Sequence, residues 1–405
     1  MSEGGTQAQE AQAGGRALAV LLLVVFINLV GFGILLPLLP YYAQSFHAPA
    51  WQVTWIFTAF SIGNFFAEPF WGRLSDRIGR RPILIFTVTC SALGFIALAF
   101  APNIWMALLL RFFGGLTTGN LSTIQGYIAD VTPPERRAGR MGYLGAAYGV
   151  GFVIGPALGG LLAHDAAGSA GFRLPLILAG GLSFIAALGI VLFVKESRTR
   201  HVRSQQSTPH ISLRQAAANP VLSRILIVTF LFIAAFAAAE STFGLWTQRR
   251  FDWGPRELSL CFSTVALTAA LAQGFLTGPL TRRYGEAAML TAGLAILCVS
   301  LALQPLGQGQ AHTILLLALT VFGQSLILPN ISALLSRTTS ADSQGAVLGL
   351  NQAMGALARA SGPVMGGALF SIVGPSAPFY AGALLVAPAV FLAWQAEKAA
   401  RGRRA

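Results

Sequence analysis

Three ionisable side chains stand inside long apolar stretches of this sequence. Glu68 lies in the segment FFAEPFW, Arg111 in LLLRFFGG and Glu240 in FAAAESTF. A charge in such surroundings is unfavourable unless it faces protein or a water-filled cavity, so each is a candidate functional group. Burial favours the neutral form of a carboxylate, which lets it take up and release a proton near neutral pH. Glu68 and Glu240 are therefore candidate proton carriers.

Each of these groups also has a structural explanation. Glu68 stands shortly before a basic segment and could pair with the Arg residues there. Glu240 could face an outer aqueous vestibule, and Arg111 could cap backbone carbonyl groups. Asp130 precedes a Pro-Pro-Glu-Arg-Arg segment, and we expect it to form an ion pair in that loop.

Other chemistries lack the residues that they need. The three cysteines, Cys90, Cys261 and Cys298, are far apart inside apolar runs, which argues against a metal site or a disulfide framework. The sequence contains no catalytic set of Ser, Cys or His, no cluster of metal ligands and no phosphate-binding GxxxxGK[ST] loop. We therefore expect no enzymatic activity, no cofactor and no metal.

The composition indicates a protein surrounded by lipid. Of its 405 residues, 55% are hydrophobic and only 10% are charged, whereas soluble domains carry about 25% charged residues. Residues 17–37, 83–101 and 174–194 contain no charge, and about 20 such residues form a helix that crosses about 30 Å of hydrocarbon. We predict an all-α integral membrane protein with twelve transmembrane helices, the first of them retained rather than cleaved as a signal peptide.

The basic residues fix the expected orientation. The net charge is +13, but the Arg residues are scattered between apolar runs, which argues against a nucleic-acid partner. With the N-terminus in the cytoplasm, 21 of the 27 Arg and Lys residues fall on the cytoplasmic side and four fall outside. This bias follows the positive-inside rule. It predicts a multi-pass protein of the inner membrane whose two termini are cytoplasmic.

One long polar stretch divides the chain into two groups of six spans. The expected organisation is a disordered cytoplasmic tail at 1–15, a six-helix bundle at 16–194, a cytoplasmic linker at 195–219, a second six-helix bundle at 220–396 and a basic cytoplasmic tail at 397–405. The halves repeat each other: GRLSDRIGR at 72–80 resembles GPLTRRYGE at 278–286, and GPALGG at 155–160 resembles GPVMGG at 362–367. Two matches at nearly the same offset predict a duplicated, pseudo-symmetric pair of bundles around a central cavity.

The basic segment after the second span, GRLSDRIGRR at 72–81, resembles the signature loop of the major facilitator superfamily. Glycine permits a tight turn there, and the acid can accept strong hydrogen bonds from Arg. The resemblance implies a cytoplasmic loop that latches the two halves together. The residues expected to form this latch are Gly72, Arg73, Asp76, Arg77, Gly79, Arg80 and Arg81.

The fifth span is rich in glycine and resembles the antiporter motif of proton-coupled drug exporters in that superfamily. Glycines let neighbouring helices approach closely, and a proline inside the span can bend it. The motif residues are Gly145, Gly149, Gly155, Pro156, Gly159 and Gly160. Arg111 and Gly115 match an Arg-x-x-x-Gly segment that the family uses in proton coupling, so the resemblance adds Arg111 to the coupling candidates.

Nearly the whole chain resembles the twelve-helix drug:proton antiporters, especially the tetracycline exporters. It departs from the latter at Asn28 and Gly94, where they carry acids, and this departure argues against tetracycline as the substrate. Polar and aromatic side chains on the expected cavity helices could bind a largely apolar ligand, or they could join helices to each other. They are Asn28, Asn64, Gln125, Trp246, Gln324, Asn330, Asn351 and Gln352.

The sequence thus predicts a secondary active transporter, monomeric, that exchanges protons for a small organic compound or drug by alternating access. A first alternative keeps the fold but makes the protein an exporter or symporter of a metabolite or sugar. A second is a scaffold or receptor that transports nothing. The intramembrane charges argue against the second, because a scaffold gains nothing from an unfavourable buried charge.

Overall fold

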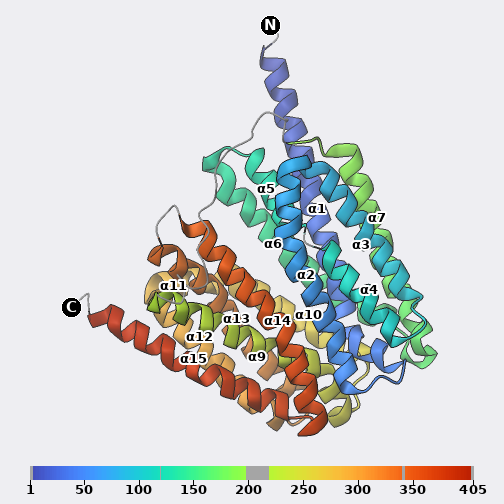
Figure 1. Cartoon of the computed structure of the whole chain (residues 1–405), viewed down its shortest axis with the longest axis vertical. Helices are drawn as coiled ribbons and strands as arrows, with labels where there is room; N and C mark the ends of the chain where they lie inside the picture. The colour runs from blue at the N-terminus through green and yellow to red at the C-terminus, as the bar shows by residue number, and fades with distance from the viewer. Residues whose placement is uncertain (1–2, 119, 198–218, 340–342, 403–405) are drawn as a thin grey trace. The chain divides into compact units, whose positions relative to one another are not determined.

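The computed structural model describes residues 3–118, 120–197, 219–339 and 343–402 (Figure 1). Every regular element within these ranges is a helix. The chain forms two compact units, each with its own packing. The first unit comprises Met1–Phe46, Ala59–Ser204 and Pro255–Ser263, and the second comprises His47–Thr58, Gln205–Gly254 and Thr264–Ala405.

The first sequence half contains eight described helical elements. They are α1 (Glu3–Gln44), α2 (Ala50–Ile78), α3 (Arg80–Ala99), α4 (Ile104–Thr117), α5 (Leu121–Asp130), α6 (Pro134–Leu162), the short 3₁₀ segment η1 (Asp165–Phe172) and α7 (Arg173–Phe193). Helix α1 packs against α6 and α7, and α3 packs against α7 and α4. The core of this first half is aliphatic, with Leu21, Val24 and Ile190 completely buried.

The second half repeats this arrangement. Its described elements are α9 (Pro220–Phe251), α10 (Pro255–Leu271), the π-helical turn η2 (Ala272–Leu276), α11 (Thr277–Tyr284), α12 (Glu286–Leu303), η3 (Gln304–Leu306), α13 (Gln310–Thr338), α14 (Gln344–Ile372) and α15 (Ala377–Gly402). Helix α9 packs against α14 and α15, and α12 packs against α15 and α13. Each of these four pairs is the counterpart of a pair in the first half. The expected pseudo-symmetric duplication is therefore confirmed at the level of helix packing.

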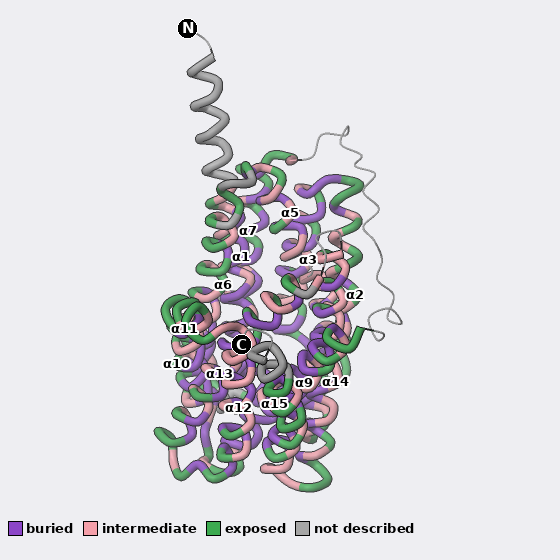
Figure 2. Tube along the Cα trace, turned by 90° about the vertical axis from the view of Figure 1, so that its left-hand side faces the viewer, coloured by how far each residue is buried: buried purple, intermediate pink, exposed green. Residues whose placement is uncertain are grey.

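Nine of the described helices are long and apolar enough to cross a membrane. Helices α2 and α14, with 29 residues each, and the consecutive α4 and α5 complete a set of twelve segments, although they are not among these nine. Buried and exposed residues alternate along the helices (Figure 2). On α7 the exposed side chains after Arg173 are apolar: Ile185 is 60% exposed and Leu192 63%. Such a surface suits lipid rather than water.

Three local features differ from the sequence-based expectation. Helix α1 begins at Glu3, so residues expected to form an unstructured tail are helical; Ala, Gln and Glu are good helix formers. The fourth span, expected to be continuous over 104–130, is divided into α4 and α5. The segment expected to be a loop at 72–81 is helical except at Gly79.

The break after α4 has a clear origin in the sequence. Gly114, Gly115, Thr117 and Thr118 are all weak helix formers. The backbone carbonyls at the end of α4 nevertheless have partners: the Thr118 hydroxyl donates to the Gly114 and Gly115 carbonyls at 3.2 and 3.1 Å. The indole N–H of Trp71 on α2 donates to the Leu116 carbonyl at 2.6 Å. The break therefore leaves these polar groups satisfied, as an apolar environment demands.

Candidate functional site

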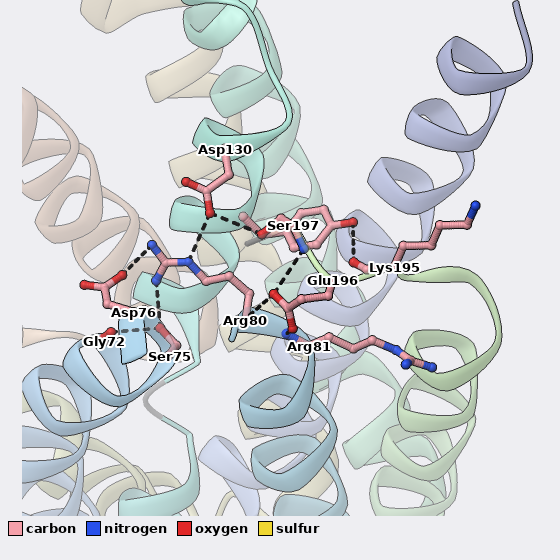
Figure 3. A network of polar contacts seen from close by, with 10 residues as sticks. Gly72, Ser75, Asp76, Arg80, Arg81, Asp130, Lys195, Glu196 and Ser197 are labelled. Carbon is pink, nitrogen blue, oxygen red and sulfur yellow. Dashed lines mark hydrogen bonds and ion pairs between the residues drawn. The ribbon is translucent and has the colours of Figure 1, made fainter. Parts of the chain in front are cut away.

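A tight turn joins α2 to α3. Ile78 ends α2, Arg80 begins α3, and Gly79 lies between them with φ 113° and ψ 155°. A side chain is strained at such a φ, so the turn requires glycine. The single-residue connection directs Arg80 and Arg81 to opposite sides of the turn, as Figure 3 shows.

Arg80 is the centre of a polar network in the first unit (Figure 3). Arg80 is only 7% exposed. Its guanidinium nitrogens lie 2.7 Å from a carboxylate oxygen of Asp76 and 3.4 Å from one of Asp130. It also donates to the Ser75 hydroxyl at 2.7 Å. Gly126 on α5 leaves the space that the guanidinium occupies, because a Cβ there would overlap it. The ion pair expected at Asp130 therefore exists, but its partner is Arg80 from a distant part of the sequence.

Glu196, which follows α7 in the sequence, caps the start of α3 at this turn. One carboxylate oxygen accepts the backbone N–H of Arg80 at 2.9 Å, and the other accepts that of Arg81 at 3.1 Å. Glu196 thus satisfies two of the N–H groups that a helix start leaves without partners and places a negative charge at the positive end of α3. A Cβ at Gly79 would lie 2.8 Å from the Glu196 carboxyl carbon.

The segment around Glu196 is held by its neighbours as well. The Tyr127 hydroxyl on α5 donates to the Lys195 carbonyl at 2.9 Å. The Ser197 hydroxyl donates to the same Asp130 oxygen that contacts Arg80, at 3.2 Å. The end of the first bundle and the start of the predicted linker are thereby joined to the α2–α3 turn.

The other expected latch residues lie around this network. Gly72, Arg73, Asp76 and Arg77 belong to the last two turns of α2 rather than to a loop, because the helix breaks only at Gly79. The Arg73 side chain donates to the Pro69 carbonyl at 3.0 Å, and that of Arg81 to the Val191 carbonyl at 2.7 Å. All of these contacts lie within the first unit. The proposal that the segment latches both halves stays a prediction.

Replacing Glu196 by Ala should destabilise the first unit, because two N–H groups of α3 lose their acceptor. We expect the free energy of unfolding to fall by about 1 kcal/mol, a typical value for the loss of a helix cap. Thermal unfolding of the purified protein in detergent measures this loss. Lys195→Ala is the matched control, because Lys195 contributes its backbone carbonyl to the contact with Tyr127. Equal unfolding temperatures for the two variants would contradict a capping role for Glu196.

The glycines of α6 form a close contact with α1. An added Cβ would lie 2.7 Å from the Phe26 carbonyl at Gly151, 2.7 Å from the Val30 carbonyl at Gly155 and 2.6 Å from the Ile34 carbonyl at Gly159. Pro156 is buried in the same contact and packs against Gly33 of α1. Small residues therefore let the two helix backbones approach closely.

Not every residue of the expected antiporter motif belongs to that contact. Gly145 is exposed, with nothing within 4 Å of an added Cβ, and Gly149 is half-buried. Helical spacing of four residues places Gly151 rather than Gly145 in line with Gly155 and Gly159. Gly160 points to another neighbour, Ser259 of α10, whose Cβ an added methyl group would overlap.

The corresponding glycines of α14 pack on α9 in the second unit. An added Cβ at Gly362 would lie 2.6 Å from the Ala234 carbonyl, and one at Gly366 would lie 2.7 Å from the Ala238 carbonyl. The Thr229 hydroxyl on α9 donates to the Asn351 side chain on α14 at 2.7 Å. The motif repeated in the sequence is therefore the same helix contact made twice.

Arg111 is buried on α4, with 5% of its residue exposed. Its guanidinium lies over the Phe60 ring at 4.2 Å, and its Nε atom has no hydrogen-bond partner among the described residues. The centroid of the Phe60 ring lies 5.7 Å from that of Phe32, and the centroid of the Phe32 ring lies 6.2 Å from that of Phe152. Residues of α1, α2, α4 and α6 thus form one aromatic cluster that ends in a buried positive charge.

The two intramembrane acids have different surroundings. Glu68 is half-buried on α2 in the first unit, one turn before Gly72. Glu240 is half-buried on α9 in the second unit. Arg359 is exposed in the middle of α14, the helix that packs on α9. The second unit therefore carries an acid and an Arg inside two helices that pack against each other.

The expected cavity residues divide into two groups. Trp246 is 1% exposed and its ring contacts those of Phe243, Phe251 and Phe379 in tilted or edge-to-face arrangements, so it belongs to the core of the second unit. Among the amides, Asn64, Asn330 and Asn351 hydrogen-bond to nearby side chains or backbone, as buried amides must. The remaining amides are half-buried or exposed and stay candidates for ligand contact: Asn28, Gln125, Gln324 and Gln352.

Sequence reasoning did not place Arg359, Glu196, Gly126 or Gly151 among the candidate site residues. Arg359 carries a usable signal, because it is a charge inside a span. Its neighbour Glu240 is far away in the sequence, however, and only the packing of α9 on α14 joins them. Glu196 and Gly126 carry no comparable signal, since an acid after a span and a glycine inside one are both common.

Comparisons with known proteins agree with this architecture. The family model of the Major Facilitator Superfamily matches residues 21–254 and again 225–404. The class G tetracycline resistance protein of Vibrio anguillarum is 30% identical over 87% of this chain and 90% of its own length. Multidrug resistance protein 2 of Bacillus subtilis is 26% identical over 87% and 88%, respectively.

A solved structure extends the likeness. The human organic anion transporter MFSD10 aligns with a TM-score of 0.70 and 25% identity over 94% of this chain and 99% of its own. The two matches to one family model cover both sequence halves, and the helix packing repeats between them. The chain therefore belongs to the major facilitator superfamily and is a multi-pass membrane transporter of the branch that includes drug exporters, not an enzyme.

Proposed function

We propose that this protein exports a small organic compound in exchange for protons, by alternating access. The observation that supports the proposal is the packing of α9, which carries the half-buried Glu240, on α14, which carries Arg359. A proton on Glu240 removes its negative charge and leaves the positive charge of Arg359 uncompensated. One proton therefore changes the charge of the site by one unit, which can alter its affinity for a substrate.

The exchange follows from this change of charge. Glu240 takes up one proton from the outside, the protein reorients, and the same proton leaves Glu240 to the cytoplasm while the carrier returns with substrate. In this scheme the protein acts as a monomer in the inner membrane. The distribution of Arg and Lys supports a cytoplasmic location for both termini.

Two features bear on the substrate. The relatives are named for resistance to tetracycline and to several drugs, which favours a xenobiotic compound. The two Arg residues within the spans, Arg111 and Arg359, are positive groups in aromatic or apolar stretches. One similar structure is that of an organic anion transporter. An organic anion is therefore the second candidate substrate, and it would also suit the alternative role of a metabolite carrier.

Purified protein in liposomes tests the coupling directly. With tetracycline, ethidium and fluorescein as probes, a pH gradient should drive one of them into the acidic compartment, and nigericin should abolish the accumulation. Accumulation on the alkaline side would instead indicate a symporter. Movement that ignores the gradient would indicate a facilitator, and no movement of any probe above that in empty liposomes would contradict export of this class of compound.

A further inference from the structure

The outer face of α3 carries a groove that the exchange scheme does not use. The groove encloses about 810 Å³ and runs along α3 from Arg81 past Ile85 and Phe86 to Cys90, with Glu196 at the same end as Arg81. Arg81 points away from the Arg80 network, as Figure 3 shows. The groove therefore adjoins the α2–α3 turn at Glu196, while the Arg81 side chain lies outside the Arg80 network.

The groove lies on a surface suited to lipid. Phe86 is 52% exposed and Leu93, two turns further along the same helix, is 53% exposed. From Pro82 to Ala99, α3 contains no charged residue. The nine residue steps from Arg81 to Cys90 span about 13 Å at the rise of an α-helix, close to the thickness of one hydrocarbon leaflet, about 15 Å.

Arg81 keeps N–H donors for an anion at the end of the groove, beside the Glu196 carboxylate. The two Glu196 oxygens already accept the backbone N–H groups of Arg80 and Arg81. Arg81 gives one hydrogen bond to the Val191 carbonyl, and a guanidinium has five N–H donors. A phosphate group at this place would meet a cation, and the apolar groove below it would receive a hydrocarbon chain.

We propose that this groove binds one anionic phospholipid, with its phosphate at Arg81 and one acyl chain lying along Ile85 and Phe86 towards Cys90. Basic groups beside transmembrane helices at the cytoplasmic surface recognise anionic head groups in this way. The bound lipid would cover the face of α3 whose first N–H groups Glu196 caps, so it would also stabilise the α2–α3 turn.

Cys90 offers a probe inside the groove. In a Cys261→Ala/Cys298→Ala background, Cys90 is the remaining thiol, and its alkylation by N-ethylmaleimide in detergent reports whether the groove is filled. Phosphatidylglycerol should slow the alkylation about fivefold more than phosphatidylcholine with the same acyl chains, the effect expected for one Arg at a membrane surface. Native mass spectrometry should show one phosphatidylglycerol retained per protein.

Two variants decide whether Arg81 is responsible. Arg81→Gln should remove the difference between the two lipids. Arg77→Gln should preserve it, because Arg77 is exposed one turn earlier and does not line the groove. Unchanged unfolding temperatures in detergent without added lipid establish that both variants are folded. Phe86→Ala keeps the charge of Arg81 but removes an apolar contact with the acyl chain, so it should also reduce lipid retention.

Three results would overturn the proposal. Equal protection of Cys90 by the two lipids would leave only a nonspecific apolar contact. Retention of the lipid difference in Arg81→Gln would place the head group elsewhere. Equal protection by glycerol phosphate, which has no acyl chain, would identify an ordinary anion site rather than a lipid site.

Discussion

Replacing Glu240 by Gln should abolish substrate accumulation driven by a pH gradient while leaving downhill exchange of substrate intact. If one proton is exchanged per substrate, a gradient of one pH unit supports about tenfold accumulation, because one unit corresponds to about 1.4 kcal/mol. Gln has the shape of a protonated Glu but cannot release a proton. The ratio of substrate concentrations across liposomes should therefore fall to about one.

Glu68→Gln is the matched comparison, because Glu68 is the other half-buried acid within the spans. If Glu240 is the carrier, Glu68→Gln keeps the accumulation. If Glu68→Gln loses it and Glu240→Gln does not, the proton is carried in the first unit. Wild-type accumulation in both variants would show that neither acid couples transport to protons.

Arg359 separates the proton role from the substrate role. In Arg359→Gln the helix that packs against the Glu240 helix loses its positive charge. The pH at which transport is half-maximal should then shift, whereas a residue that merely packs would change only the amount of folded protein. For an anionic substrate, the same variant should also raise KM.

The second large effect is expected at the crossing of α1 and α6. Gly155→Val should prevent stable folding, because the new side chain would meet the Val30 carbonyl at 2.7 Å and the Cα of Gly33 at 2.8 Å. Both are backbone atoms of α1, so the helices must separate. Overpacking of this kind costs about 1–3 kcal/mol or more. Thermal unfolding in detergent and the yield of monodisperse protein measure the loss.

The control lies in the same glycine-rich stretch. Gly145→Val adds a side chain where nothing lies within 4 Å, so it should leave the unfolding temperature nearly unchanged. Gly362→Val should behave like Gly155→Val, because its Cβ would lie 2.6 Å from the Ala234 carbonyl. Similar losses at Gly145 and Gly155 would show that the contact with α1 is not what the glycines provide.

Sequence alone was sufficient for the fold because lipid imposes a strong rule on composition. Every helix that crosses a bilayer must be apolar over about 20 residues, so runs such as 174–194 predict α7 to within a residue or two. The repeated GPxxGG motif likewise predicts two equivalent helix contacts, which α1–α6 and α9–α14 provide. The family assignment, made from the loop and the glycine motif, is confirmed by matches across both halves.

The candidate site was less accessible from sequence, for a physical reason. Amide and aromatic side chains have the same composition in a core and in a cavity, so Trp246 was expected to line a cavity but is buried among aromatic rings. Contacts between distant residues, such as Glu196 with the start of α3, follow from tertiary packing that local patterns do not encode. The single-residue turn at Gly79 was expected to be a longer loop because charged residues are common both in loops and at the ends of helices.

The position of Glu196 matters for anyone who divides this protein into two separately produced fragments. A cut after α7 at Phe193 looks natural from the helix boundaries, but it would remove the carboxylate that completes α3 from the N-terminal fragment. A cut placed after Ser197 keeps the cap and its contacts with Tyr127 and Asp130 on one polypeptide. In this chain the contacts of the first helical bundle therefore continue a few residues beyond α7.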